Sequence, residues 1–558
     1  PAPLSALILT LLAKAPEDRY QTAYGVAHDL RALLAAHQAG TPLEAVALRA
    51  EDVSSRFAIP GKLYGRATEA ATLLEAFHRA SRGARELFLV AGYSGIGKSA
   101  LVQEVYRPIT EHRGWYCAGK FDQFRRDLPY AALIEALRDL VRQLLTETDA
   151  RIADLRNKLL AALGDNGQVI VDVVPELEAV IGTQSAVPDV SPTEAQHRFD
   201  NVFKQFIRVF ARPEHPLTLF IDDLQWADIP SLRLLQVLIT DPNGGHLFVV
   251  GAYRDNEVYA GHALLDTLDA IREAGQEPET ITLAPLDRPT VTQLVADTLR
   301  VSPADAAFVG RLVHDKTGGN PFFVKELLGT LYTDGLLGFD HAARSWTWDD
   351  DALAAVGITD NVVDLVARRL NQLAPETIAV LQHAACIGSS FDLRTLARVC
   401  EGTLAQTAAA LQSALDDGFV LPLDDAYKYM EALDAVSERG GDAGMGTAWY
   451  RFLHDRVHQA AYSLLSEAER QGMHLRTGQI LWDSADPAER EERLMDVANH
   501  FDMAKALLVD PIQRRQATQI LLAAGRRAIA SMAFAPAARS LSSALALLPH
   551  DAWTSDYD

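Results

Sequence analysis

The chain has 558 residues, of which 48% are hydrophobic and 23% are charged, and its formal net charge is −22. This length predicts several domains, because single hydrophobic cores stop growing well before it is reached. The negative charge argues against a broad nucleic-acid or membrane-surface footprint, and no apolar run is long enough to cross a membrane. The cysteines Cys117, Cys386 and Cys400 show neither zinc spacing nor a disulfide framework, which indicates a reducing, cytoplasmic setting.

Residues 1–36 predict two amphipathic helices, joined by the segment 14–23. This pattern resembles the last helices of a bacterial Ser/Thr protein kinase, in which the arginine matching Arg19 is buried against a glutamate far upstream. That glutamate and the kinase catalytic motifs are absent, so this chain is not expected to phosphorylate protein. The alternative is a generic helical hairpin. Because the first residue is Pro1, we expect a fragment of a longer protein.

The central motif is a glycine-rich loop that reads G-x-x-x-x-G-K-S and follows an apolar run at 87–91. A predicted helix, Ala100–Val105, comes directly after it. Glycines let backbone N–H groups approach a phosphate closely, and a helix N-terminus adds further donors. Lys98 is expected to reach the β- and γ-phosphates of ATP or ADP, and the Ser99 hydroxyl to ligate Mg²⁺. The predicted nucleotide-binding residues of this segment are Gly92, Tyr93, Ser94, Gly95, Ile96, Gly97, Lys98, Ser99 and Ala100. The alternative is a glycine-rich turn that matches by chance.

After the loop, Trp115–Gly119 predicts a second strand, and residues 129–163 predict a long helical region. Residues 164–195 are rich in loop signals and contain an apolar segment, 169–174, whose state the pattern leaves open. A helix is expected at 194–211.

A second landmark is the apolar run that starts at Leu217 and ends in the carboxylates Asp222 and Asp223. A buried parallel strand ends at the edge of the sheet where nucleotides bind. Asp222 is therefore expected to hold the Mg²⁺ shell, and Asp223 to orient or activate the attacking water. The alternative is an ordinary strand end with surface acids.

Two further strands are predicted at 246–254 and 280–283, and their alternation with helices predicts a parallel α/β sheet. Arg254, at a strand end, is a candidate contact for the γ-phosphate, and the alternative is a surface arginine. Residues 286–335 predict helices, in which Asn320 suits a helix cap and Pro321 the first helical position.

Residues 362–470 predict a small helical domain with a β-hairpin, a winged-helix pattern. Its predicted elements are helices at 362–372, 375–386, 391–400 and 403–417, strands at 419–423 and 449–454, and a loop at 434–447. Residues 403–420 contain no Lys or Arg. A helix without cations releases no counterions from DNA phosphates, so counterion release would add nothing to its affinity for DNA. We therefore interpret the domain as a docking or nucleotide-sensing module and expect no nucleic-acid partner.

The C-terminal region, 476–558, predicts alanine-rich helices with one tetratricopeptide-like repeat that would bind protein partners. Its matching positions are Gly525, Ala537, Leu541, Ala544 and Pro549, and Pro536 suits the start of the second helix.

Taken together, residues 57–470 resemble the signal-transduction ATPases with numerous domains, which carry an AAA-type P-loop ATPase module. The motifs behind this resemblance are Gly92–Ser99, Leu217–Asp223, Gly319–Phe322 and Phe452–Val457. The resemblance implies an ATPase core, a helical lid, a winged helix and helical repeats. With residues 1–36, it extends to large bacterial fusions of a Ser/Thr kinase, an ATPase and a sensor histidine kinase.

The resemblance also implies roles for single residues. The Gly-Arg turn that begins at Gly65 and the lid residue Pro321 would both contact the adenine. His454 would donate a hydrogen bond to the β-phosphate of ADP. The alternative for His454 is a helix cap or a half-buried structural position. Many related ATPases have Glu where Asp223 stands, and the shorter side chain predicts a slow Mg²⁺-dependent ATPase.

The predicted domains are a kinase-like end at 1–36, a linker at 37–55, a P-loop ATPase domain at 56–285, a lid and connector at 286–361, a winged-helix-like domain at 362–475 and helical repeats at 476–558. The favoured function is an ATP-driven regulatory switch. The alternatives are an ATP-dependent transcription regulator, which the lack of Lys and Arg in the helix at 403–417 argues against, and a scaffold with a degenerate site, which the intact Lys98, Ser99 and Asp222 argue against.

Overall fold

The computed structural model describes all residues except 14–18, 50–51, 53–54, 124–128, 189, 260, 341–342, 356–369, 372, 424–447, 531–532 and 549–558. Several predictions fall outside the described residues: residues 14–18 of the joining segment, nearly all of the helix at 362–372, the loop at 434–447, and Pro549. The chain divides into two units. The first comprises Pro1–Thr68, Gly95–Leu101 and Ala284–Val362, and the second Glu69–Ser94, Val102–Leu283 and Val363–Asp558.

The second unit contains a five-stranded parallel sheet with the strand order β2-β3-β4-β1-β5. Its strands are β1 (Arg85–Ala91), β2 (Trp115–Lys120), β3 (Leu217–Asp222), β4 (Leu247–Tyr253) and β5 (Glu279–Thr282). The central strands are nearly continuous apolar runs, because both of their faces are covered. This confirms the parallel α/β sheet of a P-loop NTPase core that the sequence predicts.

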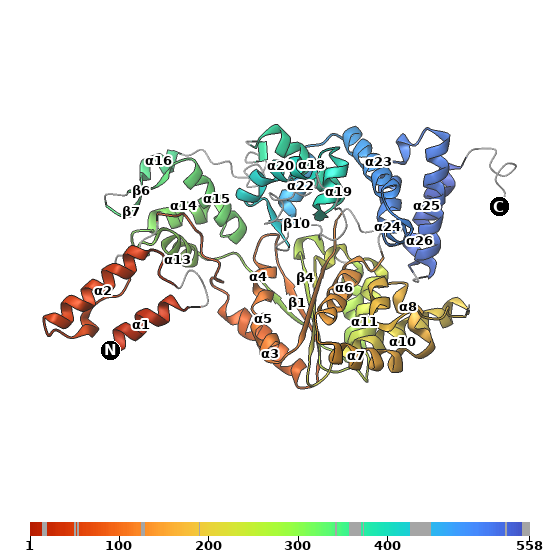
Figure 1. Ribbon diagram of the computed structural model, residues 1–558, viewed down its shortest axis with the longest axis horizontal. Coiled ribbons are helices and arrows are strands. Elements are labelled where there is room, and N and C mark those ends of the chain that lie inside the picture. Colours follow the sequence, from red (N-terminus) through yellow and green to blue (C-terminus); the bar gives the residue numbers. More distant parts are fainter. Residues whose placement is uncertain are drawn as a thin grey trace. The chain divides into compact units, whose positions relative to one another are not determined.

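Helices cover both faces of this sheet (Figure 1). On one face Phe77 of α3 (Ala67–Ser81) packs against Phe248 of β4, with ring centroids 6.1 Å apart. On the other face α6 (Ala131–Leu145) lies so close to β2 that a Cβ at Gly119 would meet the carbonyl oxygen of Ala132. The other helices that the chain forms between its strands are α4 (Lys98–Gln103), α5 (Tyr106–Glu111), α7 (Asp149–Leu163), α8 (Gly167–Val171), α9 (Glu178–Ile181), α10 (Pro192–Phe210), α11 (Ile229–Ile239) and α12 (Ala263–Glu273).

The strand register determines which residues lie side by side at the carboxyl ends of the strands. Lys120 of β2 is paired with Asp222 of β3, and Ala91 of β1 is paired with Tyr253 of β4. The carboxyl ends of these four neighbouring strands therefore meet at one edge of the sheet, the edge where α/β proteins bind ligands.

In the first unit, two helices form at the N-terminus, α1 (Ala2–Leu11) and α2 (Ala23–Gln38), as predicted. Arg19 is exposed, and its Nε donates to the carbonyl of Ala13 at 2.7 Å. In the segment predicted as a linker, Asp52 is only 5% exposed and accepts the backbone N–H groups of Gln21 and Thr22. This part of the segment is thus held against the start of α2.

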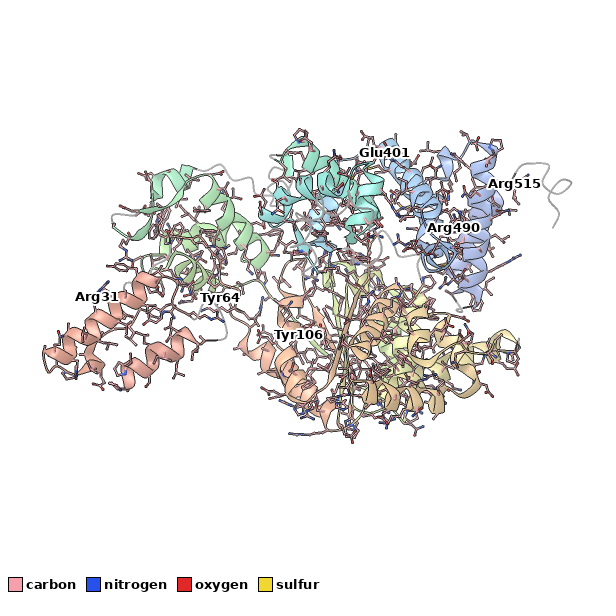
Figure 2. The ribbon with its side chains drawn as sticks, viewed as in Figure 1. Arg31, Tyr64, Tyr106, Glu401, Arg490 and Arg515 are labelled. Carbon is pink, nitrogen blue, oxygen red and sulfur yellow. The ribbon has the colours of Figure 1, made fainter. Side chains whose placement is uncertain are left out.

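The rest of the first unit is built from α13 (Arg288–Leu299), α14 (Ala307–Thr317), α15 (Pro321–Thr333), α16 (Asp350–Ala355) and a hairpin of β6 (Leu337–Asp340) and β7 (Ser345–Trp348). This hairpin was not predicted from the sequence. Trp346 of β7 is buried and lies edge-on to Phe57, with ring centroids 5.8 Å apart. The hydroxyl of Tyr64, labelled in Figure 2, donates to Asp297 of α13 at 2.8 Å.

Residues 373–423 and 448–463 of the second unit form helices and a small antiparallel sheet of order β8-β10-β9. The elements are α18 (Pro375–Ile387), β8 (Ser390–Asp392), α19 (Leu393–Val399), α20 (Leu404–Asp416), β9 (Val420–Pro422), β10 (Trp449–Phe452) and α22 (Asp455–Ser463). The helix predicted at 391–400 begins only at Leu393, because Asp392 ends β8 and caps the helix by accepting the N–H of Thr395.

The C-terminal helices are α23 (Glu467–Asp483), α24 (Pro487–Met503), α25 (Pro511–Ala530) and α26 (Phe534–Leu547). Gly525 allows α25 and α26 to approach, since a Cβ there would lie 2.7 Å from Cγ of Leu541. Arg490, labelled in Figure 2, lies over the ring of Trp482 and donates to its carbonyl. Among the described residues, no helix combines the length and apolarity needed to cross a membrane.

Candidate nucleotide-binding site

The glycine-rich loop joins β1 to α4, as the sequence predicts. Gly92, Gly95 and Gly97 have φ angles of 145°, 78° and 102°. Glycine adopts such positive angles freely, whereas a residue with a side chain would be strained there. Lys98 is the first residue of α4 and is 7% exposed, while Ser99 is exposed. This backbone suits the cradle of N–H groups that binds phosphate.

The N-terminus of α15 contacts this loop within the first unit. The N–H of Phe322 is shared between two acceptors, the Asn320 side chain at 3.1 Å and the carbonyl of Gly95 at 3.2 Å. Asn320 therefore caps α15, and Pro321 occupies its first position, as predicted. The contact with Gly95 places the Asn320-Pro321-Phe322 motif beside the phosphate loop.

The turn before α3 is fixed by contacts within the same unit. Gly65 has a φ of 63°, and a Cβ there would lie 3.0 Å from Thr290. The guanidinium of Arg66 is buried and donates to the carbonyl of Ala284. The turn at Gly65 is thus tied to the segment that joins β5 to α13.

The two carboxylates at the end of β3 have different surroundings. Asp222 is partly exposed and accepts the N–H of Asp223 at 2.9 Å. Asp223 is 3% exposed and has a left-handed backbone, with φ 55°. A non-glycine residue in this conformation is uncommon, and such residues concentrate at functional sites.

Asp223 is held by three side chains within the second unit. Its Oδ1 accepts from Gln225 Nε2 at 2.7 Å and lies 3.4 Å from Nε of Arg254. Its Oδ2 lies 3.2 Å from Nζ of Lys120, at the end of β2. The alternative of ordinary surface acids is therefore wrong for Asp223, which is a buried, ion-paired carboxylate.

Arg254 follows β4 and is 2% exposed, so the alternative of a surface arginine is wrong. Besides Asp223, it pairs with Glu257 at 2.9 Å and lies over the ring of Trp226, 4.4 Å from its centroid. Trp226 in turn donates its indole N–H to Glu257. Buried charges need such partners, and these contacts fix the guanidinium in one place.

Lys120 and Gln225, which both contact Asp223, were not predicted from the sequence. Gln225 links two members of the cluster, because its Oε1 accepts the backbone N–H of Arg254 while its Nε2 binds Asp223. The signal available for Lys120 was its position directly after the predicted strand Trp115–Gly119, where a cation can meet the carboxylates that end a neighbouring strand.

Asp228, the next acid in the chain after Asp223, has a different role. It caps α11 by accepting the N–H of Ser231 at 2.9 Å, and it also accepts the N–H of Tyr130. Burial raises the pKa of its carboxyl above the usual value. Its contacts make it a structural residue between α11 and the start of α6.

His454 is the N-cap of α22, and its Nδ1 accepts the N–H of Arg456 at 3.1 Å. The capping role considered as the alternative is thus present in the structure. Among the described residues, no group of three His, Cys, Asp or Glu side chains is arranged to hold a metal ion through protein ligands alone. The hydroxyl of Ser99 and the carboxylate of Asp222 are hard oxygen donors, the type that Mg²⁺ binds alongside phosphate and water.

Comparison with known proteins supports the ATPase assignment. Residues 62–250 match the family model for the AAA ATPase domain. The chain therefore carries an AAA-type ATPase domain.

The curated relatives are larger signalling proteins. The chain is 28% identical to the hybrid signal transduction histidine kinase G of Dictyostelium discoideum, in an alignment that covers 96% of this chain and 19% of that protein. It is 22% identical to the peroxide stress-activated histidine kinase mak3 of Schizosaccharomyces pombe, over 76% of this chain and 22% of that protein. The chain thus spans about a fifth of the length of these relatives.

Solved structures give weaker likenesses. A signal transduction ATPase with numerous domains and a tetratricopeptide repeat sensor from Pyrococcus horikoshii matches at 12% identity and a TM-score of 0.43, over 89% of this chain and 59% of that one. The ORC1 protein of Aeropyrum pernix, solved in complex with DNA, matches at 14% identity and a TM-score of 0.32, over 73% of this chain and 94% of that one.

Proposed function

We propose that this chain is the nucleotide-dependent switch of a larger signalling protein, which binds ATP and ADP with Mg²⁺ and hydrolyses ATP slowly. The observation that carries the proposal is the unbroken phosphate-loop sequence Gly92–Ser99, whose glycines have positive φ angles between a buried parallel strand and a helix. Few other uses require that sequence and that backbone together.

In this proposal Lys98 binds the β- and γ-phosphates, and the Ser99 hydroxyl and Asp222 hold Mg²⁺. The sheet supports this assignment, because β1 and β3 are parallel, are separated only by β4, and end at the same edge. When bound, Mg²⁺ would neutralise charge that develops on the transferred phosphoryl group.

Asp223 is the proposed water-orienting carboxylate, and Arg254 the proposed γ-phosphate contact. The ion pair between them supports a slow reaction, since each group would have to loosen its hold on the other before it acted on the nucleotide. Pro321 is the proposed adenine contact and His454 the proposed contact to the β-phosphate of ADP. The contact of Phe322 with Gly95 supports a lid that responds to the nucleotide.

The relatives named as histidine kinases support a place for this switch inside a hybrid sensor kinase. We propose further that residues 1–36 end a Ser/Thr kinase-like lobe, that residues 362–475 form a winged-helix-like docking module, and that the helices of 476–558 bind protein partners. The lack of Lys and Arg in α20 supports docking to protein rather than to DNA.

The experiment is to identify the nucleotide that the purified chain retains. We expect acid denaturation of the unaltered protein to release ADP, and Lys98→Ala to carry little or none. Lys158→Ala is the matched control, because Lys158 is an exposed lysine whose ion pair with Asp154 lies on the surface of α7. Equal nucleotide content in all three proteins would contradict the assignment of Lys98.

A further inference from the structure

Within the first unit, the N-terminal helix α2 contacts the hairpin of β6 and β7. The guanidinium of Arg344, which directly precedes β7, lies over the ring of Tyr24 in α2, 3.7 Å from its centroid. A guanidinium at this distance is attracted by the electrons of the ring face. Arg344 has a left-handed backbone, with φ 54°, a conformation that non-glycine residues adopt rarely and chiefly at functional sites. Because β6 and β7 are paired up to Asp340 and Ser345, the hairpin holds Arg344 against α2.

The segment that follows α2 in the chain holds this helix in place. Asp52 accepts the backbone N–H groups of Gln21 and Thr22 at 2.8 and 2.9 Å. Asp29 of α2 is fully buried and accepts the N–H of Arg49 at 2.6 Å. The helix is therefore bound at two points to the segment that leads away from it.

The chain next packs along the lid. Phe57 stacks on Tyr332, with ring centroids 4.5 Å apart and an angle of 5° between the ring planes. Further on, Nζ of Lys62 lies 2.5 Å from a carboxylate oxygen of Asp297 in α13. The N-terminal helices are thus joined to the lid by two routes, directly through Tyr24 and along the chain through Phe57.

The helix α15 connects these contacts to the phosphate loop. At its N-terminus the N–H of Phe322 donates to the carbonyl of Gly95, and in its last turn Tyr332 stacks on Phe57. A helix of 13 residues is about 20 Å long and moves as one element. A shift of α15 that begins at Gly95 therefore also moves the surface on which α2 lies.

We propose that α2 docks on the lid through Tyr24 and Arg344, and that this contact couples the N-terminal helices to the nucleotide state of the phosphate loop. The inference rests on the proposed function, in which Gly92–Ser99 binds the nucleotide, and it names the surface through which the switch acts on the segment before it. Bound ADP fixes the phosphate loop, the loop fixes α15, and the docking of α2 becomes stronger. Coupling between two sites is reciprocal, so a variant that weakens the docking binds ADP more weakly by the same factor.

The test measures the Kd for ADP with Mg²⁺ in the unaltered chain and in three variants. Arg344→Gln removes the cation, and Tyr24→Leu removes the ring but keeps an apolar side chain. Arg31→Gln is the matched control, because Arg31 is an exposed arginine of α2, labelled in Figure 2. The strength of an exposed cation–π contact predicts a Kd about two- to fivefold weaker in Arg344→Gln and in Tyr24→Leu, and an unchanged Kd in Arg31→Gln.

Hydrogen–deuterium exchange of the α2 backbone amides measures the docking itself. ADP should slow this exchange about two- to fivefold in the unaltered chain, and the slowing should disappear in Arg344→Gln. In the Arg344→Gln background, Tyr24→Leu should weaken ADP binding no further, because the two side chains act as one contact. Additive losses in the double variant would overturn the proposal, as would α2 exchange that ADP leaves unchanged.

Tyr24 is 50% exposed and Arg344 is partly exposed, so either single variant tests the contact if the other does not fold. Failure of both to fold would overturn the proposal, because the contact would then be a structural one. Absence of ADP binding by the unaltered chain would contradict the proposed function as well. ADP binding with equal Kd values in all four proteins would contradict only the coupling through Tyr24 and Arg344.

Discussion

A substitution of His454 is the most informative single change, because the same ring caps α22 and is the proposed contact to the β-phosphate of ADP. Its Nδ1 accepts the N–H of Arg456, and a backbone N–H only donates, so Nδ1 carries no proton. The ring is then neutral and carries its proton on Nε2. This form of the ring has one N–H, whereas a protonated imidazole has two. The remaining Nε2–H can still donate to the β-phosphate of ADP, as the proposed contact requires.

Two substitutions separate capping from phosphate binding. His454→Ala removes the cap of α22, which costs about 1 kcal/mol of stability, and it removes the phosphate donor as well. His454→Asp keeps an excellent cap but places a negative charge where the phosphate would bind. Loss of a hydrogen bond to a charged group costs about 1.5–3 kcal/mol, or about 10- to 100-fold in ADP release.

The assay is the release rate of a fluorescent ADP analogue, with urea unfolding measured on the same proteins. We expect faster release from both variants, and lower stability in His454→Ala only. His37→Ala, at an exposed histidine on α2, is the control and should change neither. Release from His454→Asp at the rate of the unaltered chain, with the fold intact, would refute the phosphate contact and leave His454 as a helix cap.

Three further predictions concern the fold and the buried charges. Gly119→Ala should destabilise the chain by about 3 kcal/mol or more, because its Cβ would collide with the carbonyl oxygen of Ala132, and an unchanged urea midpoint would contradict the close packing of β2 on α6. Arg254→Ala should cost about 3–5 kcal/mol by leaving the Asp223 carboxylate buried with one cation fewer, and a loss below about 1 kcal/mol in thermal unfolding would contradict the buried pair. Burial lowers the pKa of His474 from 6.5 to about 4. Between these two pH values the unfolded chain binds a proton at this histidine that the folded chain does not bind. The free energy of unfolding should therefore fall by about 3 kcal/mol as the pH falls through this window. His474→Gln should show a flatter pH dependence of the unfolding midpoint, and an identical slope would contradict the shift.

The elements set by local pattern could be predicted from the sequence. The strands β1 and β3 appear as apolar runs because both faces of a parallel sheet are buried, and the phosphate loop appears because its chemistry requires a fixed spacing. The segment 169–174 could not be assigned, since a short apolar run fits a strand or a buried helix. The structure makes Gly167–Val171 helical.

The contacts that define the candidate site depend on pairing across the sheet. Lys120 and Asp223 are far apart in sequence and meet only because β2 and β3 are neighbours in register. The surroundings of Arg254 likewise depend on Asp223 and Trp226, which precede β4 in the chain and lie beside Arg254 only because β3 pairs with β4. The hairpin of β6 and β7 did leave a local signal that was missed, the alternation Ser-Trp-Thr-Trp in β7.

The most direct test of the central claim is titration of ADP with Mg²⁺ into the nucleotide-free chain and into Lys98→Ala, followed by isothermal calorimetry. The account predicts one ADP bound per unaltered chain, and an affinity at least about tenfold weaker in Lys98→Ala, because a cation facing the phosphates is gone. Circular dichroism would establish that both proteins are folded. Equal affinities in two folded proteins would contradict the account, since the glycine-rich loop would then not be where this chain binds a nucleotide.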